Sequence, residues 1–105
     1  MILTTTESVP GRTIVQALGM VRGSTVRAAH IEHDVMAKLK NLVGGELPEY
    51  TKLLAEAREQ ALDRMIEQAR AQGADAIVAV SFASSEIDSG AAEVLAYGTA
   101  VKLAR

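Results

Sequence analysis

The fold is decided by residues 48–72, which read PEYTKLLAEAREQALDRMIEQARAQ. Apolar side chains recur in this stretch at spacings of three and four residues, as on one face of an amphipathic helix. The positions concerned are Tyr50, Leu53, Leu54, Ala57, Ala61, Met65, Ile66 and Ala69. Pro48 suits the first turn of a helix, and Gly73 supplies a left-handed stop directly after the last turn. The stretch therefore predicts one long helix with a continuous apolar face.

Two strand-like runs follow this helix. Residues 76–82 read AIVAVSF and residues 94–103 read VLAYGTAVKL. Short apolar runs of this kind, rich in β-branched residues, are typical of strands. The connection Asp88-Ser89-Gly90-Ala91 has turn composition. We expect the two runs to form a hairpin.

Two further strands are predicted before the helix. Ile2–Thr6 is rich in β-branched residues and is closed by the turn signal Pro10-Gly11, which indicates a short edge strand. Thr13–Arg27 reads as a long strand in which Gly19 and Gly23 predict bulges or bends.

A short helix is predicted between these strands and the long helix. Asp34 can cap it, apolar residues follow at helical spacing, and Gly44-Gly45 ends it. The order of elements is then β-β-α-α-β-β, which indicates an α+β fold.

The composition indicates one globular domain spanning residues 1–105. Apolar residues make up 49% of the chain and charged residues 23%, which separates it from disordered chains. Phe82, Tyr50 and Tyr97 are its aromatic residues, so the core must be built from small aliphatic side chains. A small core favours further burial against identical subunits.

Charge and cysteine content exclude several classes of function. The formal net charge of −2 argues against nucleic acid or an anionic membrane as partner, because such binding needs clustered positive charge. The absence of cysteine excludes disulfides, thiolate catalysis and cysteine-ligated metal centres. The first residues carry no secretory pattern and no run is long enough for a membrane span, so we expect a cytoplasmic location.

The strands after the helix predict an oligomer. A sheet with a helix on one face and water on the other alternates apolar and polar residues, whereas these strands are apolar on both sides. One strand presents Val78, Val80 and Phe82 against Ile77, Ala79 and Ala83, and the other presents Leu95, Tyr97 and Val101 against Val94, Ala96 and Ala100. One helix covers about one face, so we expect the second face or the sheet edges to meet another copy. The alternative is that small residues on the second face are exposed.

The segment from His30 to Asp34 (HIEHD) holds the main concentration of metal-ligating residue types. On a helix, His30 and His33 would share one side and could hold a divalent ion such as zinc, nickel or copper. A third ligand is needed and is not identified by the sequence. The alternative is a pair of surface histidines beside a helix cap.

Catalytic motifs are not found in the sequence. The carboxylates of the long helix alternate with Lys and Arg, as on a solvated, salt-bridged face. Ser81, Ser84, Ser85 and Ser89 lie outside any nucleophile elbow, and Gly44-Gly45-Glu46 lacks the residues of a phosphate loop. A non-enzymatic binding protein is therefore favoured. An enzyme with a site at the subunit interface and a structural scaffold for a partner protein remain the alternatives, and no cofactor beyond a divalent metal is suggested.

Several short motifs, in order along the chain, carry a resemblance to a known family. They are Gly44-Gly45-Glu46-Leu47, Tyr50-Thr51, Glu56-Ala57-Arg58, Ala61, Arg64-Met65, Gly73-Ala74-Asp75-Ala76-Ile77 and Ala96-Tyr97-Gly98-Thr99-Ala100-Val101. With these motifs, nearly the whole chain resembles the YbjQ-like family, small bacterial and archaeal proteins whose description is "putative heavy-metal-binding" and whose function is otherwise unknown.

The resemblance implies a two-layer, dodecin-like β-α-β-β core with an extra short N-terminal strand, in which one long helix packs on a mostly antiparallel sheet. It also implies a homopentameric ring. Arg58, Arg64 and Tyr97 match family positions, and we expect them to be assembly or pocket residues. The two histidines do not match, because the family pattern there usually reads Ser-Arg-Asn followed by Arg-Asp, whereas this chain has Ala28-Ala29-His30 and His33-Asp34.

Overall fold

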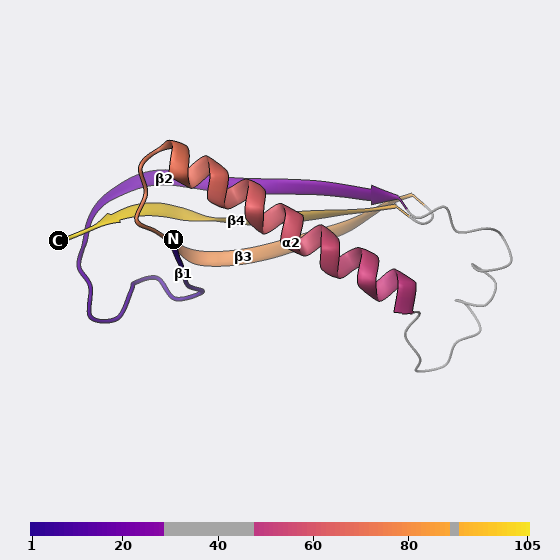
Figure 1. Ribbon diagram of the computed structural model, residues 1–105, viewed down its shortest axis with the longest axis horizontal. Helices are drawn as coiled ribbons and strands as arrows, with labels where there is room; N and C mark the ends of the chain where they lie inside the picture. Colours follow the sequence, from indigo (N-terminus) through magenta and orange to yellow (C-terminus); the bar gives the residue numbers. More distant parts are fainter. Residues whose placement is uncertain (29–47, 89–90) are drawn as a thin grey trace, which may run out of the picture.

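A computed structural model describes residues 1–28, 48–88 and 91–105 of the chain. Its elements in order are β1 (Ile2–Leu3), β2 (Ile14–Ala28), α2 (Pro48–Ala71), β3 (Ala76–Asp88) and β4 (Ala91–Leu103) (Figure 1). The predicted long helix is confirmed within one residue of its end. The short helix predicted after Asp34, together with His30 and His33, lies outside the described residues.

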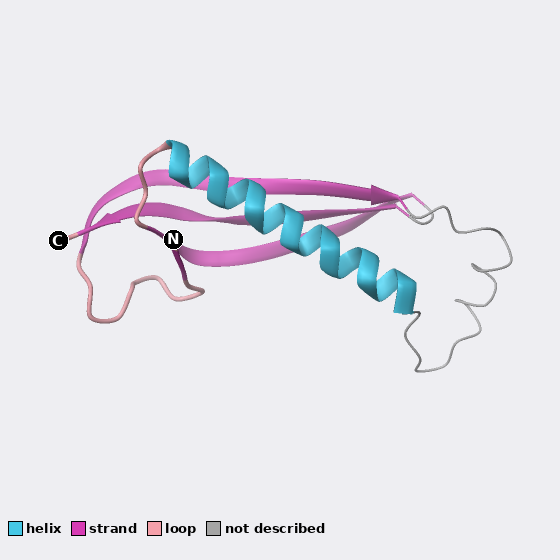
Figure 2. Cartoon of the chain, in the orientation of Figure 1, coloured by secondary structure: helices cyan, strands magenta, loops and turns pink. Residues whose placement is uncertain are grey.

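The four strands form one sheet in the order β1-β3-β4-β2. β4 is antiparallel to both of its neighbours, and the short β1 is parallel to β3. β2 and β3 therefore run in the same direction with β4 between them, and α2 crosses over one face of the sheet (Figure 2). The predicted α+β class, with one long helix on a mostly antiparallel sheet, is confirmed.

Three strand boundaries differ from the predicted ones by more than one residue, and one of them is the start of β4, which lies at Ala91 and not at Val94. The first strand ends at Leu3. Just beyond it, the hydroxyl of Thr4 donates to the carbonyl oxygen of Thr6 at 3.0 Å, and the hydroxyl of Thr6 donates to the carbonyl oxygen of Ser8 at 2.5 Å. Such local bonds turn the chain, so the regular ladder ends here, while Thr4 and Thr6 still make backbone bonds to β3. β3 continues past Phe82 to Asp88, since its polar second half pairs with the first half of β4.

The main core lies between α2 and the sheet. Its buried residues are Val21, Ala57, Ala61, Met65, Ala69, Ile77, Val94, Ala96 and Ala100. Alanines on the inner face of α2 let the helix approach the sheet closely, and the approach is closest at Gly23. A Cβ atom at Gly23 would collide with the carbonyl oxygen of Ala61 and the amide nitrogen of Met65. Glycine at this position therefore sets where α2 crosses β2.

A second, smaller cluster lies on the opposite face of the sheet. It consists of Val9, Ala76, Val78, Val101 and Leu103, with Ile14 packed against it. The segment between β1 and β2 thus folds over one end of this face. The rest of the face has no covering layer among the described residues.

Candidate functional site

The uncovered part of the sheet face is the first candidate surface. In β2, Val21, Gly23 and Thr25 point toward α2 and are buried, so the residues alternating with them point away from the helix. Those residues are Met20, Arg22, Ser24 and Val26, and their partners in β4 are Thr99, Tyr97, Leu95 and Glu93. Met20 is 64% exposed and Val26 is 59% exposed. We call this set of eight residues the uncovered face.

The prediction of two apolar faces was right for β4 and partly wrong for β3. In β4, Val94, Ala96 and Ala100 are buried under α2, and the alternating residues face away as expected. In β3, the register shifts between Val78 and Ser81, and Ala79 adopts a left-handed φ of 53°. This bulge shifts the alternation of side chains. Val78 consequently lies on the face covered by Val9, whereas Phe82 lies opposite Ala96 on the helix side.

Tyr97 sits near the middle of the uncovered face. The ladder places Arg22 on one side of it and Ser81 on the other, so a guanidinium group and two hydroxyl groups lie in one row across three strands. Tyr97 is half-buried. Its expected role in assembly or in a pocket stays a prediction.

Arg64, a residue of α2, reaches the outer edge of β2. Its Nη1 atom donates a hydrogen bond to the carbonyl oxygen of Ser24 at 2.5 Å, and Gln68 accepts one at Oε1 from the backbone amide of Arg22 at 2.7 Å. Two side chains one helical turn apart therefore close the middle of the β2 edge. Gln68 was not predicted from the sequence. The available signal was its position four residues after Arg64, which places the two side chains side by side on α2. Arg58 is exposed on α2.

The orientation of backbone groups on β3 follows from these bonds. The amide of Arg22 points away from β4, so Tyr97, its partner in β4, turns its own amide and carbonyl toward β3. Ser81, opposite Tyr97, then bonds inward. The residues whose backbone groups point outward are therefore Phe82, Ser84 and Glu86.

The occupied part of the β3 edge gives the same orientation independently. The amide of Val80 donates to the carbonyl oxygen of Thr4 at 2.9 Å, on the outer side of β3. Outward orientation at Val80 implies outward orientation two and four residues later. Beyond Val80, the outer edge of β3 has no backbone partner in the part of the chain that the structure describes.

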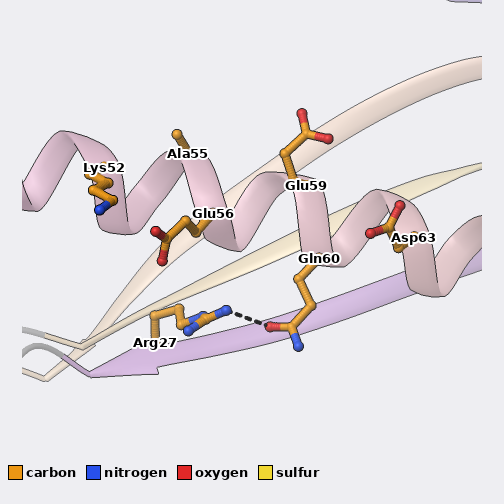
Figure 3. A pocket seen from close by; sticks show the side chains of 7 residues that line it. All are labelled: Arg27, Lys52, Ala55, Glu56, Glu59, Gln60 and Asp63. Carbon is orange, nitrogen blue, oxygen red and sulfur yellow. Dashed lines mark hydrogen bonds between the residues drawn. The ribbon is translucent and has the colours of Figure 1, made fainter.

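A groove of about 480 Å³ lies between α2 and the end of β2. It is lined by Arg27, Lys52, Ala55, Glu56, Glu59, Gln60 and Asp63 (Figure 3). Nη2 of Arg27 donates to Oε1 of Gln60 at 3.0 Å, and Nε of Arg27 is buried without a partner. The lining combines two cations with three carboxylates. This mixture of charges does not indicate whether a ligand would be an anion or a cation.

Metal ligands do not converge in the described residues. No group of three or more histidine, cysteine, aspartate or glutamate side chains there could hold an ion. His30 and His33 lie outside that part of the chain, so the histidine site stays a prediction. Among the described residues, no helix is long and apolar enough to cross a membrane.

Comparison with known proteins shows a family that spans the whole chain. A family model described as "Putative heavy-metal-binding" matches residues 1–104. The chain is 54% identical to a UPF0145 protein of Methanosarcina acetivorans over 98% of this chain and 97% of that one. It is 56% identical to one of Archaeoglobus fulgidus, over 98% and 95%, and 53% identical to one of Thermus thermophilus, over 98% and 90%. The matched relatives come from both archaea and bacteria.

A solved structure supports the fold. A protein of unknown function from Pediococcus pentosaceus, assigned to the DUF74 family, superposes with a TM-score of 0.62. The match covers 99% of this chain and 98% of the other at 18% sequence identity. At that identity the likeness concerns the arrangement of helix and strands only.

Proposed function

The chain belongs to the YbjQ family, whose model is described as "Putative heavy-metal-binding". From this membership and from the uncovered face we propose that the chain is one subunit of a homo-oligomeric ring. The ring contains five subunits, acts in the cytoplasm and holds a metal ion or a small ligand between subunits. The observation that carries the proposal is the uncovered face.

The composition of the uncovered face supports a protein contact. Met20 and Val26 are more than half exposed, and the half-buried Leu95 and Tyr97 lie beside them. Fully burying one aliphatic side chain of this size is worth roughly 1.5–3 kcal/mol. Arg22 and Glu93 supply opposite charges on the same face. A buried apolar centre with polar groups around it is the usual make-up of a subunit interface.

A ring would also supply ligands that one subunit lacks. Cyclic symmetry repeats each side chain around the axis, so an ion between subunits can gain ligands from several copies, whereas the described part of one subunit gathers no group of three. His30 and His33 are the residues that the sequence offers for this role.

Native mass spectrometry of untagged protein, purified without chelator, tests both halves of the proposal. We expect five subunits, or a multiple of five, with retained ions after addition of zinc, nickel or copper. Replacing His30 and His33 with alanine should abolish uptake of the ion without changing the number of subunits. A monomer would contradict the ring, and rings that ignore all three metals would remove the metal site.

A matched pair of lysine variants tests the contact surface. Val26→Lys places a charge at the uncovered face, and we expect it to reduce assembly at least tenfold. Glu59→Lys changes an exposed position of α2 and should leave assembly as in the parent protein. Equal behaviour of the two variants in light scattering would exclude the uncovered face as the contact.

A further inference from the structure

Among the described residues, no backbone group bonds to the outer edge of β3 over one short stretch beyond Val80. The bonds of Arg22 and Val80, carried through the strand register, direct three amides and three carbonyl groups of Phe82, Ser84 and Glu86 away from the sheet. A row of free backbone groups on a sheet edge is a template for another strand. The stretch is bounded at its start by Thr4, which occupies the outer side of Val80.

The opposite edge of the sheet restricts what that strand can be. The middle of the β2 edge is closed by Arg64 and Gln68, which hold the carbonyl of Ser24 and the amide of Arg22. A second copy therefore cannot offer the centre of its β2 without breaking these bonds. Its β3 edge offers the same free groups as the first copy. Like edges meet in a two-fold, isologous contact.

We propose that two copies of this chain pair through their β3 edges, antiparallel and in the register that places Ser84 opposite Ser84 of the second copy. In this register Phe82 lies opposite Glu86 of the second copy. Three outward residues then face three outward residues, and each such pair exchanges two hydrogen bonds, about six in all.

Other registers centred on an outward residue are less favourable. A register centred on Glu86 places two carboxylates directly opposite each other, which is repulsive. One centred on Phe82 places Ser84 of the second copy at Val80, where Thr4 is already bound. In the register centred on Ser84, the two Glu86 side chains lie about 14 Å apart along the strands.

The side chains beside the ladder are compatible with this pairing. Phe82 is 46% exposed on the helix side of the sheet, and the second copy would cover it with the aliphatic part of Glu86. Ser84 is small, so two copies of it can lie opposite each other at the two-fold axis. The open stretch also lacks lysine, arginine and proline, which commonly protect free edges from pairing.

This contact goes beyond the proposed ring and uses a different surface. A ring of five joined to a second ring through β3 edges contains ten subunits, whereas edge pairing without a ring gives a dimer. The two proposals can therefore fail separately.

Single cysteine variants test the contact and its register, because the chain has no cysteine of its own. Ser84→Cys should form a covalent dimer under mild oxidation, since the Cα atoms of a hydrogen-bonded pair lie about 5.5 Å apart. Phe82→Cys is the matched control on the same edge and face. Its two sulfur atoms would be too far apart to bond, so it should form at least tenfold less dimer. No dimer with Ser84→Cys, or equal dimer with both variants, would overturn the proposal.

A proline variant tests the backbone ladder. Ser84→Pro removes an outward amide, a change that edge strands tolerate, and should halve the mass measured by light scattering. Ser84→Lys should do the same while keeping the amide, and it covers the case in which the proline variant does not fold. Ser84→Ala should retain the parent mass. An unchanged mass for both folded variants, checked by circular dichroism, would overturn the pairing whatever the number of subunits in the ring.

Discussion

The two long strands that flank β4, β2 and β3, differ in how the backbone groups on their outer edges are bonded. On β2, the helix that covers the sheet also reaches around its rim, and Arg64 and Gln68 bind the outward groups of Ser24 and Arg22. On β3, the helix makes few contacts, and the edge beyond Val80 is left without a backbone partner among the described residues. The difference arises from where α2 crosses the sheet. A helix placed over β2 and β4 can protect one edge only.

The largest expected effect on stability is at Gly23, where α2 approaches β2 most closely. Gly23→Ala should push α2 away from β2, because the added methyl group meets the backbone of Ala61 and Met65 and neither can move independently. We expect a loss of about 3 kcal/mol in the free energy of unfolding, together with loss of the bonds that close the β2 edge. Urea denaturation measures the loss.

The neighbouring substitution Ser24→Ala is the control for that prediction. Ser24 is exposed, and the bond from Arg64 uses its backbone oxygen, which the substitution keeps. We expect a change below about 0.5 kcal/mol. If Gly23→Ala were equally mild, the close approach would not determine the position of α2.

The second effect comes from the two side chains that close the β2 edge. Arg64→Ala together with Gln68→Ala removes two hydrogen bonds worth about 1 kcal/mol each, so we expect a loss of about 2 kcal/mol. The amide of Arg22 should exchange with solvent faster, which hydrogen exchange measured by NMR would detect. Glu67→Ala, exposed on the same helix, should change neither quantity. Slow exchange at Arg22 in the double variant would show that another group protects this edge.

The third effect concerns the inner side of β2. Thr25 is 2% exposed and its hydroxyl oxygen is buried without a partner. Thr25→Val keeps the shape and removes the unpaired group, so we expect a gain of about 1 kcal/mol in the free energy of unfolding. Thr99→Val, at a half-buried position of the uncovered face, is the control and should gain less. Destabilisation by Thr25→Val would mean that the hydroxyl has a partner such as buried water.

The sequence predicted the helix and the strands better than it predicted which edges of the sheet are bonded and which are open. The period of the apolar residues in α2 and the alternation in β4 were sufficient to orient both elements, because each buries one regular face. The bulge at Ala79 carried no glycine or other local signal, so the faces of β3 were assigned wrongly beyond Val78. The edge of β2 is closed because Arg64 and Gln68 bond to residues forty or more positions earlier in the sequence. The periodicity of a single sequence carries no information on such long-range contacts.

The smallest expected effect on the single subunit lies at the open edge, which completes the contrast with β2. Phe82 is large, yet 46% exposed and outside both core clusters. Phe82→Gln should therefore change the free energy of unfolding, measured in urea where the subunits are dissociated, by less than about 0.5 kcal/mol. Assembly should weaken in the same variant, because a closed edge contributes to the stability of one subunit whereas an open edge contributes only when it is paired. A loss above about 2 kcal/mol in the dissociated subunit would mean that Phe82 belongs to the core and that the β3 edge is covered within the chain.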